Sequence, residues 1–245
     1  MTTPFKPLGR KAYGHIPHLP GSRMGEGDHK CHEGHARIAT ERTRDRHDRV
    51  IVTEKLDGSC CAVANIDGQI CALGRSGYLA KSSPYEQHQL FAYWVRREQD
   101  RFRHLPEGYR IVGEWLAQAH GTRYELNPLT EPFVVFDVFD EHNIRASTSD
   151  ARYFASTCQL DSPYVIHAGD PISIERAIEM LDSGQRGSER HYGFHGATEP
   201  VEGAVWRVER EGTFDFMCKW VRPDKIDGKY LPEISGGDAV WNWRP

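Results

Sequence analysis

Short runs of apolar and β-branched residues recur along the chain from residue 50 onward, and turn residues separate them. They predict strands over residues 50–54, 60–66, 69–74, 109–115, 133–139, 201–208 and 214–221. The Asp67-Gly68 turn predicts that the second and third strands form a hairpin. In residues 133–139, period-2 alternation predicts one face with Phe133, Val135, Asp137 and Phe139, and another with Val134, Phe136 and Val138.

Helical spacing predicts helices over residues 83–102, 149–159 and 173–181. In the first, Leu90, Phe91, Trp94 and Val95 form an apolar stripe, and Ser83-Pro84-Tyr85-Glu86 predicts a capping box with proline at the first helical position. Gly184 ends the last helix, and a polar loop with Arg186, Arg190, His191 and His195 follows it. Antiparallel strands interspersed with helices predict an α+β fold, with antiparallel sheets and flanking helices.

The first 49 residues lack this periodicity, and we expect a loop-rich extension packed on one domain of residues 50–245. Within this N-terminal extension, His29, Cys31, His32 and His35 are potential zinc ligands. No second ligand pair at a familiar spacing accompanies them, so a polar or flexible loop is favoured. Ser22 and Arg23 are candidates for gripping a terminal phosphate.

Composition is that of an ordinary globular protein, with 27% charged and 38% hydrophobic residues and a formal net charge of -4. Any nucleic-acid surface must therefore be local, and two arginine clusters are candidates: Arg42, Arg44, Arg46 and Arg49, or Arg96, Arg97, Arg101 and Arg103. Interspersed acidic residues make a solvated face equally compatible with either cluster. Six scattered cysteines without a secretory signal predict a reducing, cytoplasmic protein, and no apolar run is long enough for a membrane span.

The candidate nucleophile is Lys55, which lies between the first predicted strand and the Asp57-Gly58 turn. A lysine amine attacks phosphorus only when neutral, so its site must lower its pKa through burial or nearby cations. Attack on a nucleoside triphosphate would leave a phosphoramidate and expel pyrophosphate. Taken alone, the K-x-D-G pattern of residues 55–58 is more typical of a solvated lysine paired with Asp57.

Four later stretches change that interpretation: Gly113-Glu114-Trp115, residues 133–139, Glu202-Gly203-Ala204-Val205 with Arg207, and Lys219-Trp220-Val221-Arg222. In this order after Glu54-Lys55-Leu56-Asp57-Gly58, they resemble the nucleotidyltransferase motifs of polynucleotide ligases and capping enzymes. The chain looks most like the ATP-dependent RNA ligases of the small phage and bacterial type. The resemblance covers residues 50–222 and implies a ligase adenylation (nucleotidyltransferase) domain.

The resemblance also implies roles for individual residues. Lys55 would be adenylated by ATP, Glu114 would bind the ribose hydroxyl, and Phe136 would stack on adenine. Glu202 would act at Mg²⁺ or Mn²⁺, and Lys219 would contact the α-phosphate. Glu54 and Arg75 would line the nucleotide site, with Arg75 contacting the nucleotide or the incoming strand, and Asp57 would orient Lys55 or the water shell of the metal.

The implied reaction joins nucleic-acid ends that carry a 5′-phosphate and a 3′-hydroxyl, as RNA repair requires, with RNA favoured over DNA. Met217 departs from a K-x-K pattern common in related RNA ligases, which leaves one phosphate contact fewer unless Arg222 or Lys225 compensates. Only 23 residues follow Arg222, too few for a C-terminal OB-fold, so an accessory nucleic-acid-binding partner is one expectation. A minimal DNA ligase, a capping enzyme and a catalytically degenerate nucleotide-binding or nucleic-acid-binding module are the alternatives.

Overall fold

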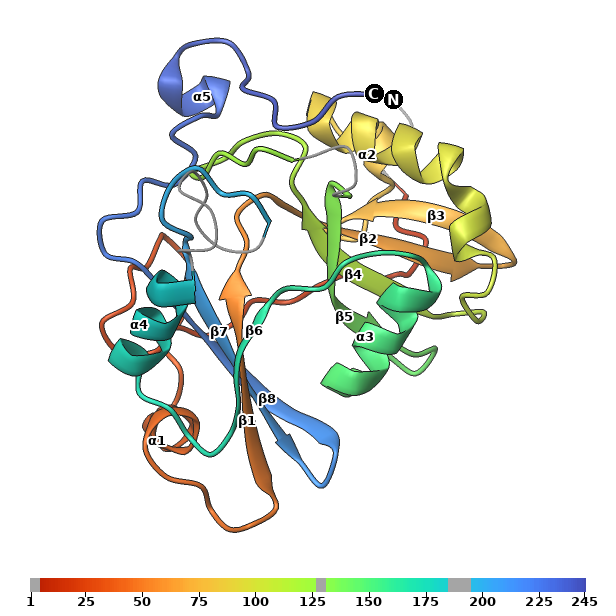
Figure 1. The fold of residues 1–245 in the computed structure, drawn as a ribbon. Helices are drawn as coiled ribbons and strands as arrows, with labels where there is room; N and C mark the ends of the chain where they lie inside the picture. Colours follow the sequence, from red (N-terminus) through yellow and green to blue (C-terminus); the bar gives the residue numbers. More distant parts are fainter. Residues whose placement is uncertain (1–4, 127–130, 185–194) are drawn as a thin grey trace.

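A computed structural model of the chain describes residues 5–126, 131–184 and 195–245. Groups of strands are separated by helices in an α+β arrangement (Figure 1). The helices are α1 (Glu33–Thr40), α2 (Glu86–Arg97), α3 (Thr148–Thr157), α4 (Ile174–Gly184) and α5 (Pro232–Ser235), with 3₁₀ turns η1 (Ala80–Ser82) and η2 (Gln99–Phe102). The strands are β1 (Asp48–Lys55), β2 (Ser59–Ile66), β3 (Gln69–Gly74), β4 (Arg110–Trp115), β5 (Phe133–Phe139), β6 (Val165–Gly169), β7 (Gly203–Arg210) and β8 (Thr213–Val221).

The strands of the described residues form two four-stranded antiparallel sheets, as the α+β prediction requires. The first has the order β6-β1-β7-β8 and the second the order β3-β2-β4-β5. Consecutive strands β1 and β2 therefore belong to different sheets. Residues 56–58 join them, so the chain crosses from one sheet to the other within a single tight turn.

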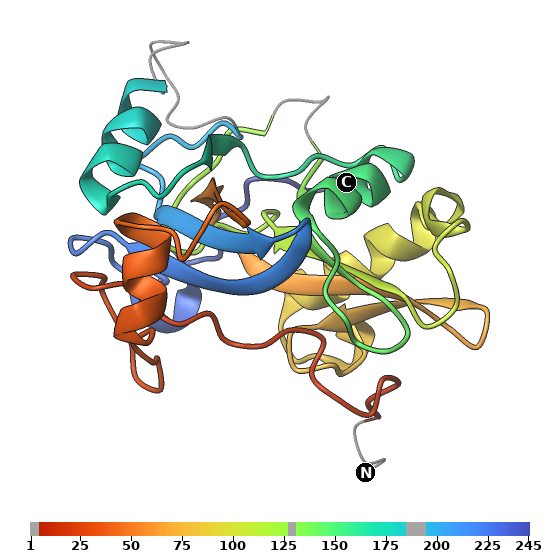
Figure 2. The ribbon, with the colours of Figure 1, turned by 90° about the horizontal axis from the view of Figure 1, so that it is seen from below.

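Each sheet has its own helical cover. Helices α1 and α4 pack on the first sheet, and α2 and α3 pack on the second, so the two sheets face each other across the middle of the molecule (Figures 1 and 2). Trp206 is fully buried in the first core. Phe91, Trp94 and Trp115 are buried in the second, where α2 presents its predicted apolar stripe.

Strand β5 contains a bulge at Phe136, where its register against β4 shifts by one residue. The predicted alternation is therefore wrong beyond this point. Phe133 and Val138 lie in the core beneath α2 and α3, whereas Phe139 packs in a separate core on the cleft side of the sheet. An extra residue in a strand exchanges the faces of all the residues that follow it.

The predicted capping box of α2 is wrong. The helix begins at Glu86 with Tyr85 as its N-cap, and Pro84 precedes the helix instead of opening it. The Ser83 hydroxyl accepts from the Tyr85 backbone N–H at 3.2 Å and lies 2.8 Å from His88 Nδ1. The helix also ends earlier than predicted, at Arg97, where residues 99–102 continue as the 3₁₀ turn η2.

Sequence periodicity missed α1, β6 and α5. Helix α1 falls inside the extension predicted to be loop-rich, where the imidazole of His32 accepts from the Gly34 backbone N–H and caps the helix. The part of the predicted polar loop that holds Arg186, Arg190 and His191 lies outside the described residues. Among the helices that the structure describes, none combines the length and the apolar character of a membrane span.

The C-terminal tail docks on the second sheet. The Trp243 ring lies edge-on to that of Trp115, with centroids 5.7 Å apart, and Asn242 Nδ2 donates to the Leu116 carbonyl at 2.7 Å. Trp241 also packs against this core, and forms an isolated bridge with Gln118. The tail tryptophans therefore contribute to packing.

Candidate active site

A cleft of about 1130 Å³ lies between the two sheets. Strands from both sheets line it, together with residues from the N-terminal extension and from the segment before α5. It is lined by the eight residues to which the resemblance assigns site roles: Glu54, Lys55, Asp57, Arg75, Glu114, Phe136, Glu202 and Lys219. The fold thus collects into one cavity residues that are spread over most of the chain.

Lys55 is the last residue of β1 and forms an ion pair with Glu202, which directly precedes β7. The amine also donates to the Leu56 carbonyl at 3.3 Å. Burial by itself would lower the pKa of Lys55, but the charges of Glu202, Glu114 and Asp57 raise it above its ordinary value. The site without ligand therefore holds this lysine as an ammonium ion.

Glu114 lies on β4 and binds the turn that follows Lys55. Its Oε1 accepts from the Gly58 backbone N–H at 3.0 Å. Burial raises the pKa of Glu114 to about 7, although Lys55 and the Gly58 N–H favour the charged form. Only glycine fits at position 58 without a shift of the backbone, because a Cβ here would lie 2.4 Å from the Trp115 carbonyl oxygen.

Asp57 forms its ion pair with Lys225, not with Lys55. The Lys225 amine lies 2.6 Å from Asp57 Oδ2, which also accepts from the Gly121 N–H at 2.9 Å. Burial opposes the charge on Asp57, but Lys225 and then Lys55 lower its pKa. This carboxylate therefore joins the turn between the sheets to the segment that follows β4.

Glu54 has a buried carboxylate at the wall of the cleft, and its side chain is 0% exposed. Its Oε1 lies 2.6 Å from His195 Nδ1 and accepts from the Tyr164 backbone N–H at 2.9 Å. Glu54 thus links β1 to the segments before β6 and β7. Arg75 lies exposed at the rim, where its guanidinium donates to the Gly14 carbonyl at 2.9 Å.

Phe136, the bulge residue of β5, packs edge-on against Tyr13 of the N-terminal extension, with ring centroids 5.1 Å apart. The Tyr13 hydroxyl donates to Asp137 at 2.6 Å and lies 3.4 Å from the Met217 sulfur. Asp137 in turn accepts from Arg207 at 2.7 Å. Tyr13 is a cleft residue that sequence reasoning missed, since no periodicity or motif marks it.

Lys219 lies on β8, and burial followed by the charge of Lys55 lowers its pKa. The proposed substitutes for the cation absent at Met217 do not line the cleft: Arg222 pairs with Asp182, and Lys225 pairs with Asp57. Arg207 is opposite Met217 in the β7–β8 register and does line the cleft. In the site without ligand, Arg222 and Lys225 are thus both engaged in ion pairs with carboxylates.

Comparison with protein families gives a decisive match. The model of the RNA ligase family matches residues 48–221, from the start of β1 to the end of β8. The chain belongs to the RNA ligase family. All the predicted site residues fall within the matched span, whereas Tyr13 and the rest of the N-terminal extension before β1 fall outside it.

Solved structures share the fold at low sequence identity. A Naegleria gruberi RNA ligase with PPi is 15% identical with a TM-score of 0.52, and the match covers 96% of this chain and 64% of that one. A mutant of the Naegleria gruberi RNA ligase with ATP and Mn is 15% identical with a TM-score of 0.51. That match covers 84% of this chain and 59% of the other. An archaeal ATP-dependent RNA ligase is 19% identical with a TM-score of 0.46, and the match covers 71% of this chain and 42% of that one.

This RNA ligase family member thus spans less than two thirds of the length of these solved chains. No curated protein sequence matches it. The structural likeness therefore supports the fold, and the chemistry must be argued from the residues of this chain.

The candidate zinc ligands of the N-terminal extension are engaged in other contacts, and the rings of His32 and His35 lie edge-on with centroids 5.9 Å apart. His32 caps α1, His35 stacks on Phe216 with ring centroids 4.0 Å apart, and Cys31 contacts Cys218. His29 lies edge-on to His15. Within residues 5–126, 131–184 and 195–245, no group of three or more histidine, cysteine, aspartate or glutamate side chains is arranged to hold a metal ion.

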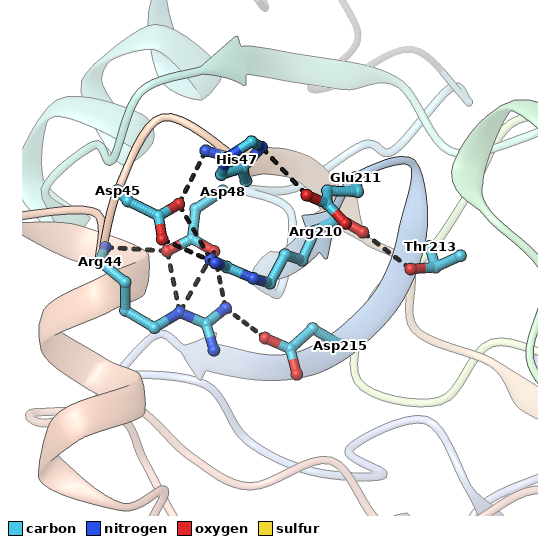
Figure 3. Close-up of polar contacts among 8 residues, drawn as sticks. All are labelled: Arg44, Asp45, His47, Asp48, Arg210, Glu211, Thr213 and Asp215. Atoms are coloured by element: carbon cyan, nitrogen blue, oxygen red, sulfur yellow. Dashed lines mark hydrogen bonds and ion pairs between the residues drawn. The ribbon is translucent and has the colours of Figure 1, made fainter.

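The first arginine cluster is partly neutralised by a network at the far end of the first sheet (Figure 3). Arg44 pairs with Asp48 at 2.7 Å and with Asp215, and Arg210 pairs with Asp45 at 2.6 Å. In the second cluster, Arg97 and Arg101 pair with acidic side chains, among them Glu98 and Glu131. Asp48 and Glu98 thus pair with arginines that lie near them in sequence, whereas Asp215 and Glu131 come from distant parts of the chain.

Proposed function

We propose that this chain is an ATP-dependent RNA ligase that forms a lysyl-AMP intermediate on Lys55. The observation that carries the proposal is the convergence of Lys55, Glu114, Glu202 and Lys219 in one buried cleft. Membership of the RNA ligase family supports this choice over a minimal DNA ligase or a capping enzyme. The presence of the lysine and both carboxylates argues against a degenerate binding module.

In the first step, the neutral Lys55 amine attacks the α-phosphorus of ATP. An N–P bond forms, the bond between the α-phosphorus and the bridging oxygen breaks, and pyrophosphate leaves. Lys219 is placed to stabilise the charge that builds on the α-phosphate oxygens. Glu114, Phe136, Glu54 and Arg75 are the proposed nucleotide contacts, with Glu114 on the ribose and Phe136 on the adenine.

Lys55 must lose its proton before it attacks. In the ligand-free site Glu202 holds the lysine in its charged form. A divalent cation such as Mg²⁺ or Mn²⁺ prefers carboxylate oxygen, so Glu202 fits as its protein ligand, and the bound ion would neutralise the triphosphate and the carboxylate charge. Asp57 is paired with Lys225, so we assign it mainly to holding the turn beneath Lys55.

In the later steps, the adenylate passes from Lys55 to a 5′-phosphate end, and a 3′-hydroxyl then displaces AMP to leave a phosphodiester. Arg75, exposed at the rim of the cleft, is the proposed contact for the incoming strand. The absence of disulfides among the described cysteines supports a reducing, cytoplasmic setting. An accessory partner that supplies further nucleic-acid contacts remains part of the proposal.

The test is the intact mass of the protein after incubation with ATP and Mg²⁺, beside Lys55→Ala. The expected gain is one AMP (~329 Da) in the parent only, as covalent lysine chemistry requires. No gain in folded protein that is not already adenylated would overturn the ligase mechanism and favour a binding module. Matched RNA and DNA ends with 5′-phosphates then separate RNA joining from DNA joining.

A further inference from the structure

A line of polar contacts runs from the N-terminal extension to Lys219. The Lys219 amine lies 3.6 Å from Asp28 Oδ1, and Asp28 Oδ2 lies 3.0 Å from His18 Nε2. On the other side of the imidazole, His18 Nδ1 lies 2.7 Å from the Ser22 hydroxyl. His18 is 1% exposed, so this line is built into the interior of the extension.

The backbone of the extension also pairs with β8 at Lys219. The Lys219 N–H donates to the Pro17 carbonyl at 2.9 Å, and the Lys219 carbonyl accepts from the Leu19 N–H at 2.8 Å. Two residues further on, the Val221 N–H donates to the Ser22 hydroxyl at 2.9 Å. Figure 2 shows this segment crossing beneath β8 on its way to α1. Main chain and side chain of Lys219 are thus both held by the same segment.

The Asp28 carboxylate is itself fixed in place. Its Oδ2 accepts from the Gly25 N–H at 3.0 Å in addition to its contact with His18, and Oδ1 lies on the side of Lys219. Burial alone would raise the pKa of Asp28, but the Gly25 N–H, Lys219 and His18 together lower it. An ionised carboxylate in a fixed position is therefore available to the lysine.

We infer that Asp28 is a positioning residue for Lys219, and that His18 and Ser22 fix Asp28. The inference rests on the proposed function, because it assigns Lys219 to the α-phosphate. A lysine side chain has about 2 kcal/mol of rotamer entropy, and a group ordered before ATP binds does not lose that freedom during the reaction. Asp28 also offsets the charge of Lys55, which acts on Lys219 in the same cleft.

The extension, in this view, is part of the nucleotidyltransferase site although it lies outside the span that matches the family. Asp28 does not need to touch ATP. Its effect should pass through Lys219, and a double-mutant cycle tests this route directly.

The experiment measures single-turnover lysyl-AMP formation and ATP affinity for the parent, Asp28→Asn, Lys219→Ala and the double variant. We expect Asp28→Asn to slow adenylation by about tenfold, with a smaller change in ATP affinity, in the parent background. In the Lys219→Ala background it should change the rate less than about twofold. Asp28→Glu, which keeps the charge, should recover part of the rate, and Glu26→Gln, an exposed neighbour, should match the parent.

Equal slowing by Asp28→Asn in both backgrounds would show a structural role and overturn the inference, as would no slowing in the parent. Thermal unfolding of each variant identifies any loss of fold, and His18→Gln, which leaves Asp28 present, then replaces Asp28→Asn in the cycle. If the parent itself forms no lysyl-AMP, the proposed function fails separately. ATP affinity then decides the inference, since Asp28→Asn should weaken binding only where Lys219 is present.

Discussion

Lys55 and Glu202 form an ion pair at the junction of β1 and β7, with side chains that are 20% and 9% exposed. The pair neutralises the resting site internally, so a ligand must compete with it to reach either group. This relationship explains how a partly buried lysine keeps its proton until the site is occupied.

The pair predicts strong coupling in stability. Lys55→Met should lower the free energy of unfolding by about 3 kcal/mol at pH 7.5, because it leaves the Glu202 carboxylate buried without its partner. Lys55→Met combined with Glu202→Gln should recover most of this loss. Urea denaturation of the parent, both single variants and the double variant measures the coupling.

An exposed pair gives the control. Arg176 and Glu179 on α4 are both 66% exposed, and Arg176→Met should leave the urea midpoint unchanged within error. Losses for Lys55→Met and Glu202→Gln that simply add in the double variant would contradict the coupling.

Glu114 should make stability depend on pH in the ligand-free protein. Its folded pKa of about 7 lies above its ordinary value, so the folded state binds its proton more tightly than the unfolded state does. The free energy of unfolding contributed by this group should therefore fall as the pH rises from about 4.5 to about 7, by on the order of 2 kcal/mol.

Glu114→Gln keeps an acceptor for the Gly58 N–H and removes the titration. Denaturant unfolding at pH 5 and pH 8 should show a smaller fall in stability for this variant than for the parent. Parallel pH profiles for the two proteins would show that Glu114 is not the group responsible.

Arg207 and Arg210 lie on the same strand but in different surroundings. Arg207 is 6% exposed and bridges Asp137 and Glu209, both buried. Arg207→Met should cost about 3–5 kcal/mol, because it leaves the buried Glu209 without its cation and leaves the buried Asp137 with Arg145 alone.

Arg210→Met is the matched control, since Arg210 is more exposed than Arg207 and belongs to the network of Figure 3. Its loss should be clearly smaller, because Arg210 and Asp45 are 36% and 43% exposed, and the buried Asp48 keeps its ion pair with Arg44. Both losses of stability are measured by thermal and urea unfolding. Adding 0.5 M salt should change the loss caused by Arg210→Met more than the loss caused by Arg207→Met. Equal losses would mean that burial does not govern these pairs.

Gly58→Ala should impair both the fold and lysyl-AMP formation. The new methyl group would meet backbone, the Trp115 carbonyl at 2.4 Å, so the turn must shift and with it the N–H that Glu114 accepts. Gly237→Ala places its methyl group near a single side-chain atom, 3.8 Å away, and should behave as the parent. Thermal unfolding and intact-mass adenylation of both variants measure the difference, and normal adenylation by Gly58→Ala would contradict this account.

The sequence was most informative where local pattern and spacing coincide. The predicted strands are all present, because β-branched runs bounded by turns depend little on distant residues. The family resemblance of the Lys55 turn and the motifs after it was sufficient to predict eight side chains that line one cleft. Strand β6 and helix α1 were missed because they are short and gain their stability from packing on the first sheet.

Within the site, pairing was harder to predict than position. Asp57 was expected beside Lys55, yet Lys225, far along the chain, takes its carboxylate. Tyr13 and Asp28 have no motif, and only the path of the extension across β8 brings Asp28 to Lys219. Such contacts depend on tertiary geometry, which periodicity does not encode.

The turn at residues 56–58 has a mechanical consequence. It is the shortest connection between the two sheets, and Lys55 and Ser59 lie at its two ends. If the sheets rotate toward each other as the cleft closes, points near the axis of rotation move least. A lysine beside this axis would keep its place while the rims of the cleft move. The nitrogen that we propose as the nucleophile would then stay at one point while nucleotide and afterwards nucleic acid bind.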